Sequence, residues 1–157
     1  MDNTLTIWDA KFYFKNFSGE EGLYNKKGDR NFGVFINDED AERLKADGWN
    51  VKYAKPDEDG YQRPFLKVKV NFKGKPKIYQ INSVNKVLLD EETVGDLDDY
   101  VFEKADIKVR HAYLRRYDTW SIYLDKGFFT ILEDDLDRAY IDRQTPIFDD
   151  EDDIPFM

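Results

Sequence analysis

The sequence predicts a mainly β domain: an OB-fold-like antiparallel barrel with extended hairpins and one or two short helices. Short runs in which apolar and polar residues alternate outnumber helical patterns, and turn residues separate these runs. The 157 residues, 41% of them hydrophobic, suffice for one packed domain with a short appendage. An OB barrel needs about five strands, so further strands would lengthen its hairpins, and a two-sheet sandwich is the alternative architecture.

Residues 5–17 form the first predicted strand. Phe12 and Phe14 point to one face of this strand, whereas the other face carries Lys11, Tyr13, Lys15 and Phe17. Residues 18–31 contain three glycines among mixed charges, a composition typical of a loop. A short apolar strand is expected at 32–36.

The clearest predicted helix starts after Asn37, a residue type that caps helix N-termini. Acidic residues fill the first turn, where the helix dipole favours them, and Gly48 is a suitable C-terminal stop. This helix should contain about ten residues. A strand at 49–54 follows, with Trp49, Val51 and Tyr53 on one side. A second, short helix is expected at 90–101.

Residues 65–81 contain the clearest hairpin pattern. Its first strand alternates strictly, so one face enters the core with Leu66, Val68, Val70 and Phe72. The opposite, exposed face presents Phe65, Lys67, Lys69 and Lys73. Turn residues at 73–76 are expected to reverse the chain, so that 77–81 runs back beside the first strand.

A second hairpin is predicted from the alternating segments 107–113 and 119–124, with a turn at 117–118. A tight turn or bulge at 125–127 then leads into an apolar strand at 128–132. These elements complete the six to eight strands expected of the domain.

The charge distribution separates a nearly neutral body from an acidic end. The net charge is −9, of which residues 1–132 contribute −1 and residues 133–157 contribute −8. Residues 61–89 hold seven basic residues and no acidic one. A second basic and aromatic cluster lies at 108–120, and the intervening segment 90–106 is acidic. A basic surface on an acidic chain indicates a polyanionic partner.

Lysines that share a strand face with aromatic residues suit a single strand of nucleic acid. The ammonium groups neutralise phosphates, and the rings stack on unpaired bases for about 1–3 kcal/mol each. The alternative without ligand binding is that these lysines only keep an exposed sheet face soluble. The predicted DNA-binding residues are Lys11, Tyr13, Lys15, Arg63, Phe65, Lys67, Lys69, Lys73, Lys75, Lys77, Tyr79, Arg110, Tyr113, Arg115 and Arg116.

Several classes of chemistry are excluded or disfavoured. The chain has no cysteine, and His111 is its only histidine, so thiol catalysis and multi-histidine metal sites are absent. No glycine-rich phosphate-binding motif occurs. We expect no catalytic residues, no metal and no cofactor, and His111 is expected to be a packed or surface side chain. The absence of a signal peptide or long apolar segment predicts a cytoplasmic protein without a membrane partner.

Residues 149–156 combine an acidic run with an apolar end: Asp149, Asp150, Glu151, Asp152, Asp153, Ile154, Pro155 and Phe156. This segment resembles the acidic C-terminal tip of bacterial single-stranded DNA-binding proteins, a plan that several bacteriophage proteins share. The resemblance implies an OB-type body at 1–146 that binds single-stranded DNA. It also implies a disordered tail at 147–157 that recruits replication, recombination and repair proteins. Met157 after Phe156 departs from the family tip, which ends on Phe.

Two other functions are compatible with parts of the pattern. A magnesium-dependent nuclease would need carboxylates such as Asp96, Asp98 and Asp99, or Glu133, Asp134 and Asp135. An acidic DNA mimic would use the overall negative charge, but the basic 61–89 segment argues against it. The sequence therefore favours a non-enzymatic single-stranded DNA-binding protein, most similar in plan to phage-encoded ones.

Overall fold

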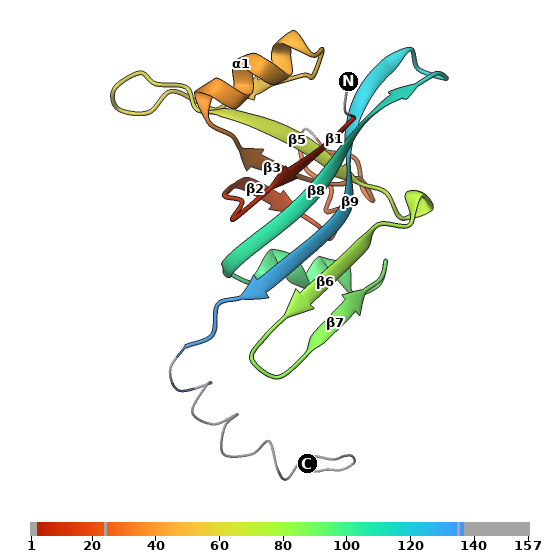
Figure 1. The fold of residues 1–157 in the computed structure, drawn as a ribbon. Helices are drawn as coiled ribbons and strands as arrows, with labels where there is room; N and C mark the ends of the chain where they lie inside the picture. The colour runs from red at the N-terminus through yellow and green to blue at the C-terminus, as the bar shows by residue number, and fades with distance from the viewer. Residues whose placement is uncertain (1–2, 24, 135, 137–157) are drawn as a thin grey trace.

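The computed structural model describes residues 3–23, 25–134 and 136 (Figure 1). The expected tail at 147–157 lies outside the described residues. Within them the chain is mainly β, as predicted, with one α-helix and two short 3₁₀ helices. The elements are β1 (Thr4–Ile7), β2 (Phe12–Asn16), β3 (Arg30–Phe35), α1 (Asp38–Ala46), β4 (Lys52–Tyr53), β5 (Pro64–Val70), η1 (Phe72–Gly74), β6 (Lys77–Ile81), β7 (Lys86–Leu89), η2 (Val94–Asp99), β8 (Phe102–Leu114) and β9 (Thr119–Ile131).

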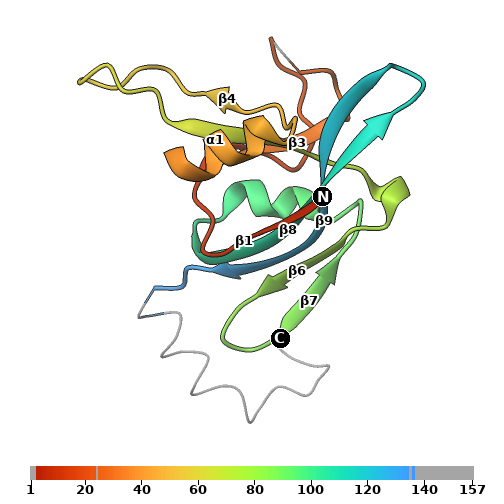
Figure 2. The same cartoon turned by 45° about the horizontal axis from the view of Figure 1, so that its top comes forward.

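The strands form one curved sheet with an OB-like arrangement. Its main order is β1-β8-β9-β5-β3-β2, while β4 pairs with β5 and the β6–β7 hairpin joins β9. The long β8–β9 hairpin runs through the molecule (Figures 1 and 2). In the view of Figure 1, α1 lies at the top, and η2 lies lower, behind the β8–β9 hairpin. The sheet is mixed, because β5 and β6 both run parallel to β9.

The predicted 65–81 hairpin is wrong, since β5 and β6 do not pair with each other. Both lie along the same edge of β9, with Lys69 beside Tyr123 and Lys77 beside Lys126. Asn71 caps η1 by accepting a hydrogen bond from the Lys73 backbone N–H. The chain therefore makes one 3₁₀ turn and continues in its original direction. The turn residues correctly indicated that the strand is interrupted here. Whether the chain then reverses is decided only by the pairing of β6 with β9.

The predicted single strand at 5–17 is two strands in different parts of the sheet. β1 pairs with β8, whereas β2 pairs with β3. Asp9 adopts φ +49°, which breaks the extended chain between them. A bulge between Phe12 and Phe14 also shifts the register, so the simple alternation of faces predicted for this segment fails.

The helix and the second hairpin agree with the sequence. The Asn37 side chain accepts from the Asp40 N–H at the start of α1, and Gly48 follows its end at φ +90°. The β8–β9 hairpin is longer than predicted: the expected strand at 128–132 is the continuation of β9 past the bulge. The short helix expected at 90–101 is η2. Only the middle of the strand expected at 49–54 forms β4.

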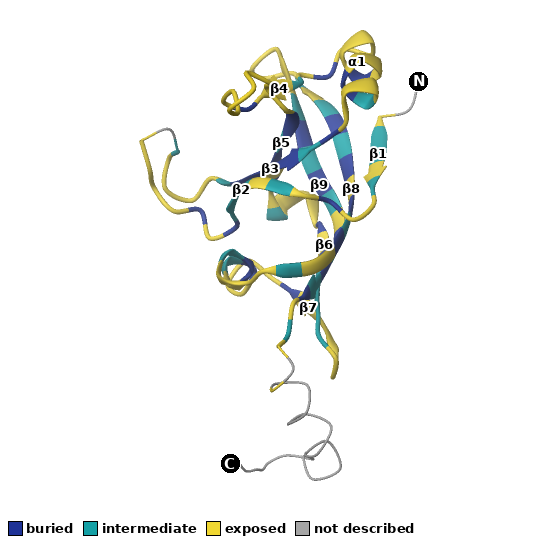
Figure 3. Ribbon diagram, turned by 90° about the vertical axis from the view of Figure 1, so that its left-hand side faces the viewer, coloured by how far each residue is buried: buried dark blue, intermediate teal, exposed yellow. Residues whose placement is uncertain are grey.

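The core lies along β3, β5, β8 and β9 (Figure 3). Phe17, Phe32 and Phe129 are fully buried, and the Phe17 ring contacts the other two. Leu66 and Val68 of β5 belong to the same core cluster. Because alternate residues of β5 enter this core, the intervening lysines are left on the opposite face. No helix among the described residues is long and apolar enough to span a membrane.

Candidate nucleic-acid interface

Three hollows meet on the face of the sheet opposite the core, and Lys67 lines all of them. The largest has a volume of about 1010 Å³ and lies between the 25–31 segment, η1 and the tip of the β8–β9 hairpin. The second, of about 220 Å³, lies beside Trp120, and the third, of about 350 Å³, lies beside Phe14. We call these three adjoining hollows, which share Lys67, the Lys67 groove.

The lining of the Lys67 groove is predominantly basic. Its basic residues are Lys26, Arg30, Lys52, Lys67, Lys69 and Lys73, and its acidic residues are Asp29 and Glu91. Among the described residues, no carboxylate lies within ion-pair distance of Lys52, Lys67, Lys69 or Lys73. Like charges without counter-charges attract an anion such as phosphate.

Two neighbouring strands set the positions of these lysines. Lys67 and Lys69 alternate with buried Leu66, Val68 and Val70, so both point away from the core. The parallel bridge to β9 places Lys69 next to Tyr123, and the Lys69 ammonium donates to the Ser121 hydroxyl at 3.3 Å. Lys52 enters from β4, which pairs with Phe65 on the edge of β5 that also carries β9, opposite β3.

Aromatic side chains line the same groove. Tyr117 lies in the turn of the β8–β9 hairpin and is 67% exposed. Trp120 lies at the start of β9 and is 50% exposed. Tyr123, Phe72 and Phe14 are half-buried members of the lining. Exposed rings beside unpaired lysines are the arrangement that single-strand binding requires.

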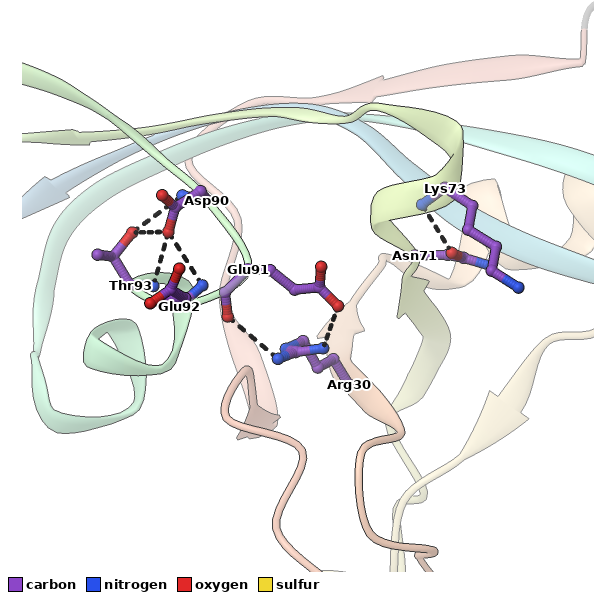
Figure 4. A network of polar contacts seen from close by, with 7 residues as sticks. All are labelled: Arg30, Asn71, Lys73, Asp90, Glu91, Glu92 and Thr93. Carbon is purple, nitrogen blue, oxygen red and sulfur yellow. Dashed lines mark hydrogen bonds and ion pairs between the residues drawn. The ribbon is translucent and has the colours of Figure 1, made fainter.

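An acidic segment reaches the groove beside Arg30 (Figure 4). Arg30 Nη1 lies 3.9 Å from Glu91 Oε2, and Nη2 donates to the Glu91 carbonyl oxygen at 3.1 Å. The Arg30 Nε is buried and has no hydrogen-bond partner among the residues that the structure describes. The Asp90 carboxylate accepts from the Thr93 hydroxyl and from nearby backbone N–H groups, which lowers the pKa of Asp90. The turn thus holds Glu91 at the rim of the groove.

The predicted exposure of Phe65 is wrong. Its side chain lies on the lysine face of β5, as the alternation requires, but only 7% of its surface is exposed. The rings of Tyr13 and Phe14 cover it, with centroids 4.9 and 6.2 Å away. The β2 bulge brings these rings over β5, an arrangement that the local sequence does not reveal. Tyr13 is the exposed member of this cluster, at 39%.

Lys15 and Lys11 lie outside the groove lining. The Lys15 ammonium donates to the carbonyl oxygens of Leu97 and Tyr100 and lies 4.4 Å from the centre of the Phe102 ring. Burial lowers the pKa of Lys15, although Asp98 and Asp99 oppose this effect. Lys11 forms an exposed ion pair with Asp9 at 3.2 Å.

Three more predicted residues line none of the three hollows. Lys75 is the left-handed C-cap of η1, at φ +55°, and Lys77 is exposed on β6. Tyr79 stacks on Phe128 with centroids 5.0 Å apart, and the Lys86 ammonium lies over both rings. This second group of rings and cations is thus separate from the Lys67 groove.

The remaining predicted residues belong to the β8–β9 hairpin and to the segment before β5. Arg110 donates to Asp125 at 3.1 Å, and Arg63 lies 4.0 Å from the Phe35 ring centre. The Tyr113 hydroxyl donates to Asp118, a hydrogen bond that raises the pKa of Tyr113. The exposed Arg115 and Arg116 lie in the turn next to Tyr117.

Several lining residues were missed by the sequence prediction: Lys26, Arg30, Lys52, Phe14, Phe72, Tyr117, Trp120 and Tyr123. Basic and aromatic composition marked the 108–120 cluster, which contains Tyr117 and Trp120. The sequence around Lys52 and Arg30 gave no comparable indication, because only the pairing of β3 and β4 with β5 brings these residues to the groove.

Two of the carboxylates weighed for a nuclease, Asp98 and Glu133, have structural partners. Both Asp98 oxygens accept backbone N–H groups, those of Phe17 at 2.7 Å and Ser18 at 2.9 Å. The Glu133 carboxylate accepts from the backbone and the hydroxyl of Ser83. In the described part of the chain, no three His, Cys, Asp or Glu side chains are grouped so that they could hold a metal ion.

The chain is similar to known phage proteins in sequence pattern and in fold. The structure titled "Single-stranded DNA-binding protein from bacteriophage Enc34 in complex with ssDNA" aligns with a TM-score of 0.52 and 7% identity, over 84% of this chain and 88% of that one. Another structure of the Enc34 protein aligns with a TM-score of 0.49 and 8% identity, over 88% and 90% of the two chains. No curated protein matches the chain. The family model described as "Putative phage ssDNA-binding domain" matches residues 1–154. The chain therefore belongs to the phage ssDNA-binding domain family.

Proposed function

We propose that the chain is a non-enzymatic single-stranded DNA-binding protein that acts in phage DNA replication, recombination or repair. The observation that carries this proposal is the Lys67 groove, where Lys52, Lys67 and Lys69 have no counter-charge among the described residues and exposed rings lie beside them. The family match supports the same function. So does the Enc34 protein, which has this fold and is titled as a single-stranded DNA-binding protein.

In this proposal the lysines hold the phosphates and the rings hold the bases. Lys67 and Lys69 lie two residues apart on one strand face, about 6.6 Å along β5, so they can contact successive phosphates of an extended strand. Tyr117 and Trp120 offer exposed rings on which bases stack whatever their sequence. Binding is therefore expected to be independent of sequence and strongly dependent on salt.

The other predicted DNA-binding residues take secondary roles. Tyr113, Arg115 and Arg116 lie at the hairpin tip next to Tyr117 and Trp120, so we propose that they contact the strand as it leaves the groove. Lys11 and Lys15 are engaged elsewhere and serve the fold. Lys75, Lys77 and Tyr79 would require a longer strand that reaches β6.

Residues 149–156 form the second functional part of this proposal. Five acids at 149–153 can compete with DNA for the groove, because a tethered segment acts at an effective concentration of about millimolar. Bound DNA would release the segment, and Ile154, Pro155 and Phe156 would then bind replication, recombination or repair proteins. We place these events in the cytoplasm of the bacterial host, where phage DNA is replicated.

Oligo-dT binding by the double variant Lys67→Gln, Lys69→Gln tests the proposal. Lys108→Gln with Lys126→Gln is the matched control, since this exposed pair gives the same net charge outside the groove. The groove variant should bind weakly, and its salt slope should fall by about 0.7 for each lost phosphate contact. The control should resemble the wild type. Equal effects of the two variants, or degradation of the oligonucleotide with magnesium, would contradict the proposal.

A further inference from the structure

His111, the only histidine of the chain, is held between two tryptophans. Its ring stacks on Trp49 at 4.7 Å and 19°, and on Trp120 at 4.5 Å and 20°. Trp49 is buried, whereas Trp120 is half exposed and has the tilted Tyr113 ring 5.3 Å from it. The register of β8 with β9 and the chain that follows α1 together build this stack of three rings. It fixes the orientation of Trp120, the ring that faces the groove.

The hollow beside this stack has the size and chemistry of a nucleobase subsite. Its volume of about 220 Å³ suits one base, and its lining includes Trp120, Ser121, Asn50 and the edge of His111. Lys52, Lys67 and Lys69 line the same hollow. A base stacked on Trp120 would therefore have its flanking phosphates within reach of these lysines.

The surroundings of His111 favour the neutral imidazole when the groove is empty. The residue is 6% exposed, and its Nε2 has no hydrogen-bond partner within the described part of the chain. Burial lowers the pKa of His111 below its ordinary value. Among the described residues, the charged groups that line the hollow are Lys52 from β4 with Lys67 and Lys69 from β5, without a carboxylate. A proton on His111 would thus add a fourth positive charge without a partner.

Bound phosphates would reverse this balance. They neutralise the three ammonium groups, so repulsion from those groups no longer opposes the cation–π attraction that an imidazolium has for the two indoles. We propose that Trp120 is the platform for one nucleobase and that His111, the positioning residue behind it, takes up a proton when a strand binds. This inference rests on the proposed function of the groove. The sign follows from linkage: if binding raises the pKa of His111, affinity increases as the pH falls.

A single histidine makes the test direct, because His is the side chain whose ordinary pKa lies between pH 5 and 8. NMR titration of the His111 ring in the wild-type protein, with and without oligo-dT, should give a higher pKa in the complex. Oligo-dT affinity should also rise between pH 7.5 and pH 5.5, by at most tenfold per pH unit for one proton. An unchanged pKa on binding would overturn the proton linkage.

Two variants separate the parts of the proposal. His111→Phe keeps a ring between the tryptophans but carries no titrating group, so its oligo-dT affinity should lack the wild-type dependence on pH. Trp120→Leu should weaken binding roughly ten- to a hundredfold, with unfolding temperature nearly unchanged because the ring is half exposed. If the Lys67 and Lys69 variant weakens binding but Trp120→Leu does not, the subsite is wrong and the groove stands. If the wild type fails to bind oligo-dT, both proposals fall.

Discussion

The Lys15 ammonium donates to the Leu97 carbonyl oxygen at 3.0 Å, and this contact ties β2 to the end of η2. Lys15 therefore differs in role from Lys69, which is exposed and points into the groove. Both lysines lie in strands next to an apolar residue, Phe14 before Lys15 and Val68 before Lys69. Their partners across the fold separate a structural cation from a candidate phosphate contact.

Lys15→Met should lower stability without changing DNA binding. The substitution leaves two carbonyl oxygens without their donor, which costs about 1–3 kcal/mol. Thermal or urea unfolding should show this loss, and the salt slope of oligo-dT binding should stay at the wild-type value. A slope reduced as in the Lys67 and Lys69 variant would show that Lys15 contacts phosphate after all.

Phe65→Ala should behave as a core substitution. The ring is buried under Tyr13 and Phe14, so its removal should cost about 3–5 kcal/mol in unfolding free energy. Affinity per folded molecule should change little. Tyr117→Ala is the counterpart: a ring that is 67% exposed should leave stability intact and cost about 1–3 kcal/mol of binding. The opposite pattern would make Phe65 the stacking residue.

Glu91→Gln should tighten DNA binding at low salt. Glu91 pairs with Arg30 at 3.9 Å on the rim of the groove, where its charge repels an incoming phosphate. Removing that charge frees Arg30 for the strand. Because Coulombic effects at the surface are screened, the gain should shrink as salt increases. Glu92→Gln removes the same charge from a neighbour that does not line the groove, and it should have a smaller effect.

Local patterns predicted the parts of the fold that local chemistry decides. The Asn37 cap, the Gly48 stop and the alternation of Lys67 and Lys69 with buried residues all follow from nearest neighbours in the sequence. The path of the chain at 71–76 does not follow from the local sequence, because the same residues can reverse a chain or merely interrupt a strand. Pairing with β9, some fifty residues away in the sequence, selects the second outcome.

The sequence likewise predicted one part of the candidate site and missed another. The lysine face of β5 was found from its period, but the cover over Phe65 depends on a bulge in β2, far along the chain. Lys52 reaches the groove only through the two-residue strand β4. The Trp49–His111–Trp120 stack unites three segments that no spacing rule connects. Long-range pairing therefore decided which predicted residues meet.

Truncation after Pro146 should tighten single-strand binding. It removes five acids and no base, which takes the net charge from −9 to −4. The lost segment can no longer compete with DNA, and the gain should be largest at low salt, where screening is weakest. Urea unfolding should show an intact body. Weaker DNA binding or an unfolded body after truncation would mean that this segment belongs to the structure.

Phe156→Ala should separate partner recruitment from the electrostatic effect of the acids. The substitution changes no charge, so oligo-dT affinity and its salt dependence should match the wild type. Loss of an apolar anchor should abolish the capture of replication or repair proteins, because the acids alone supply attraction without a group to fill a pocket. A charge-neutralised segment, with Asp149, Asp150, Glu151, Asp152 and Asp153 changed to amides, is the complementary variant: it should bind DNA more tightly. If Phe156→Ala retains its partners, Phe148 or Met157 is the anchor instead.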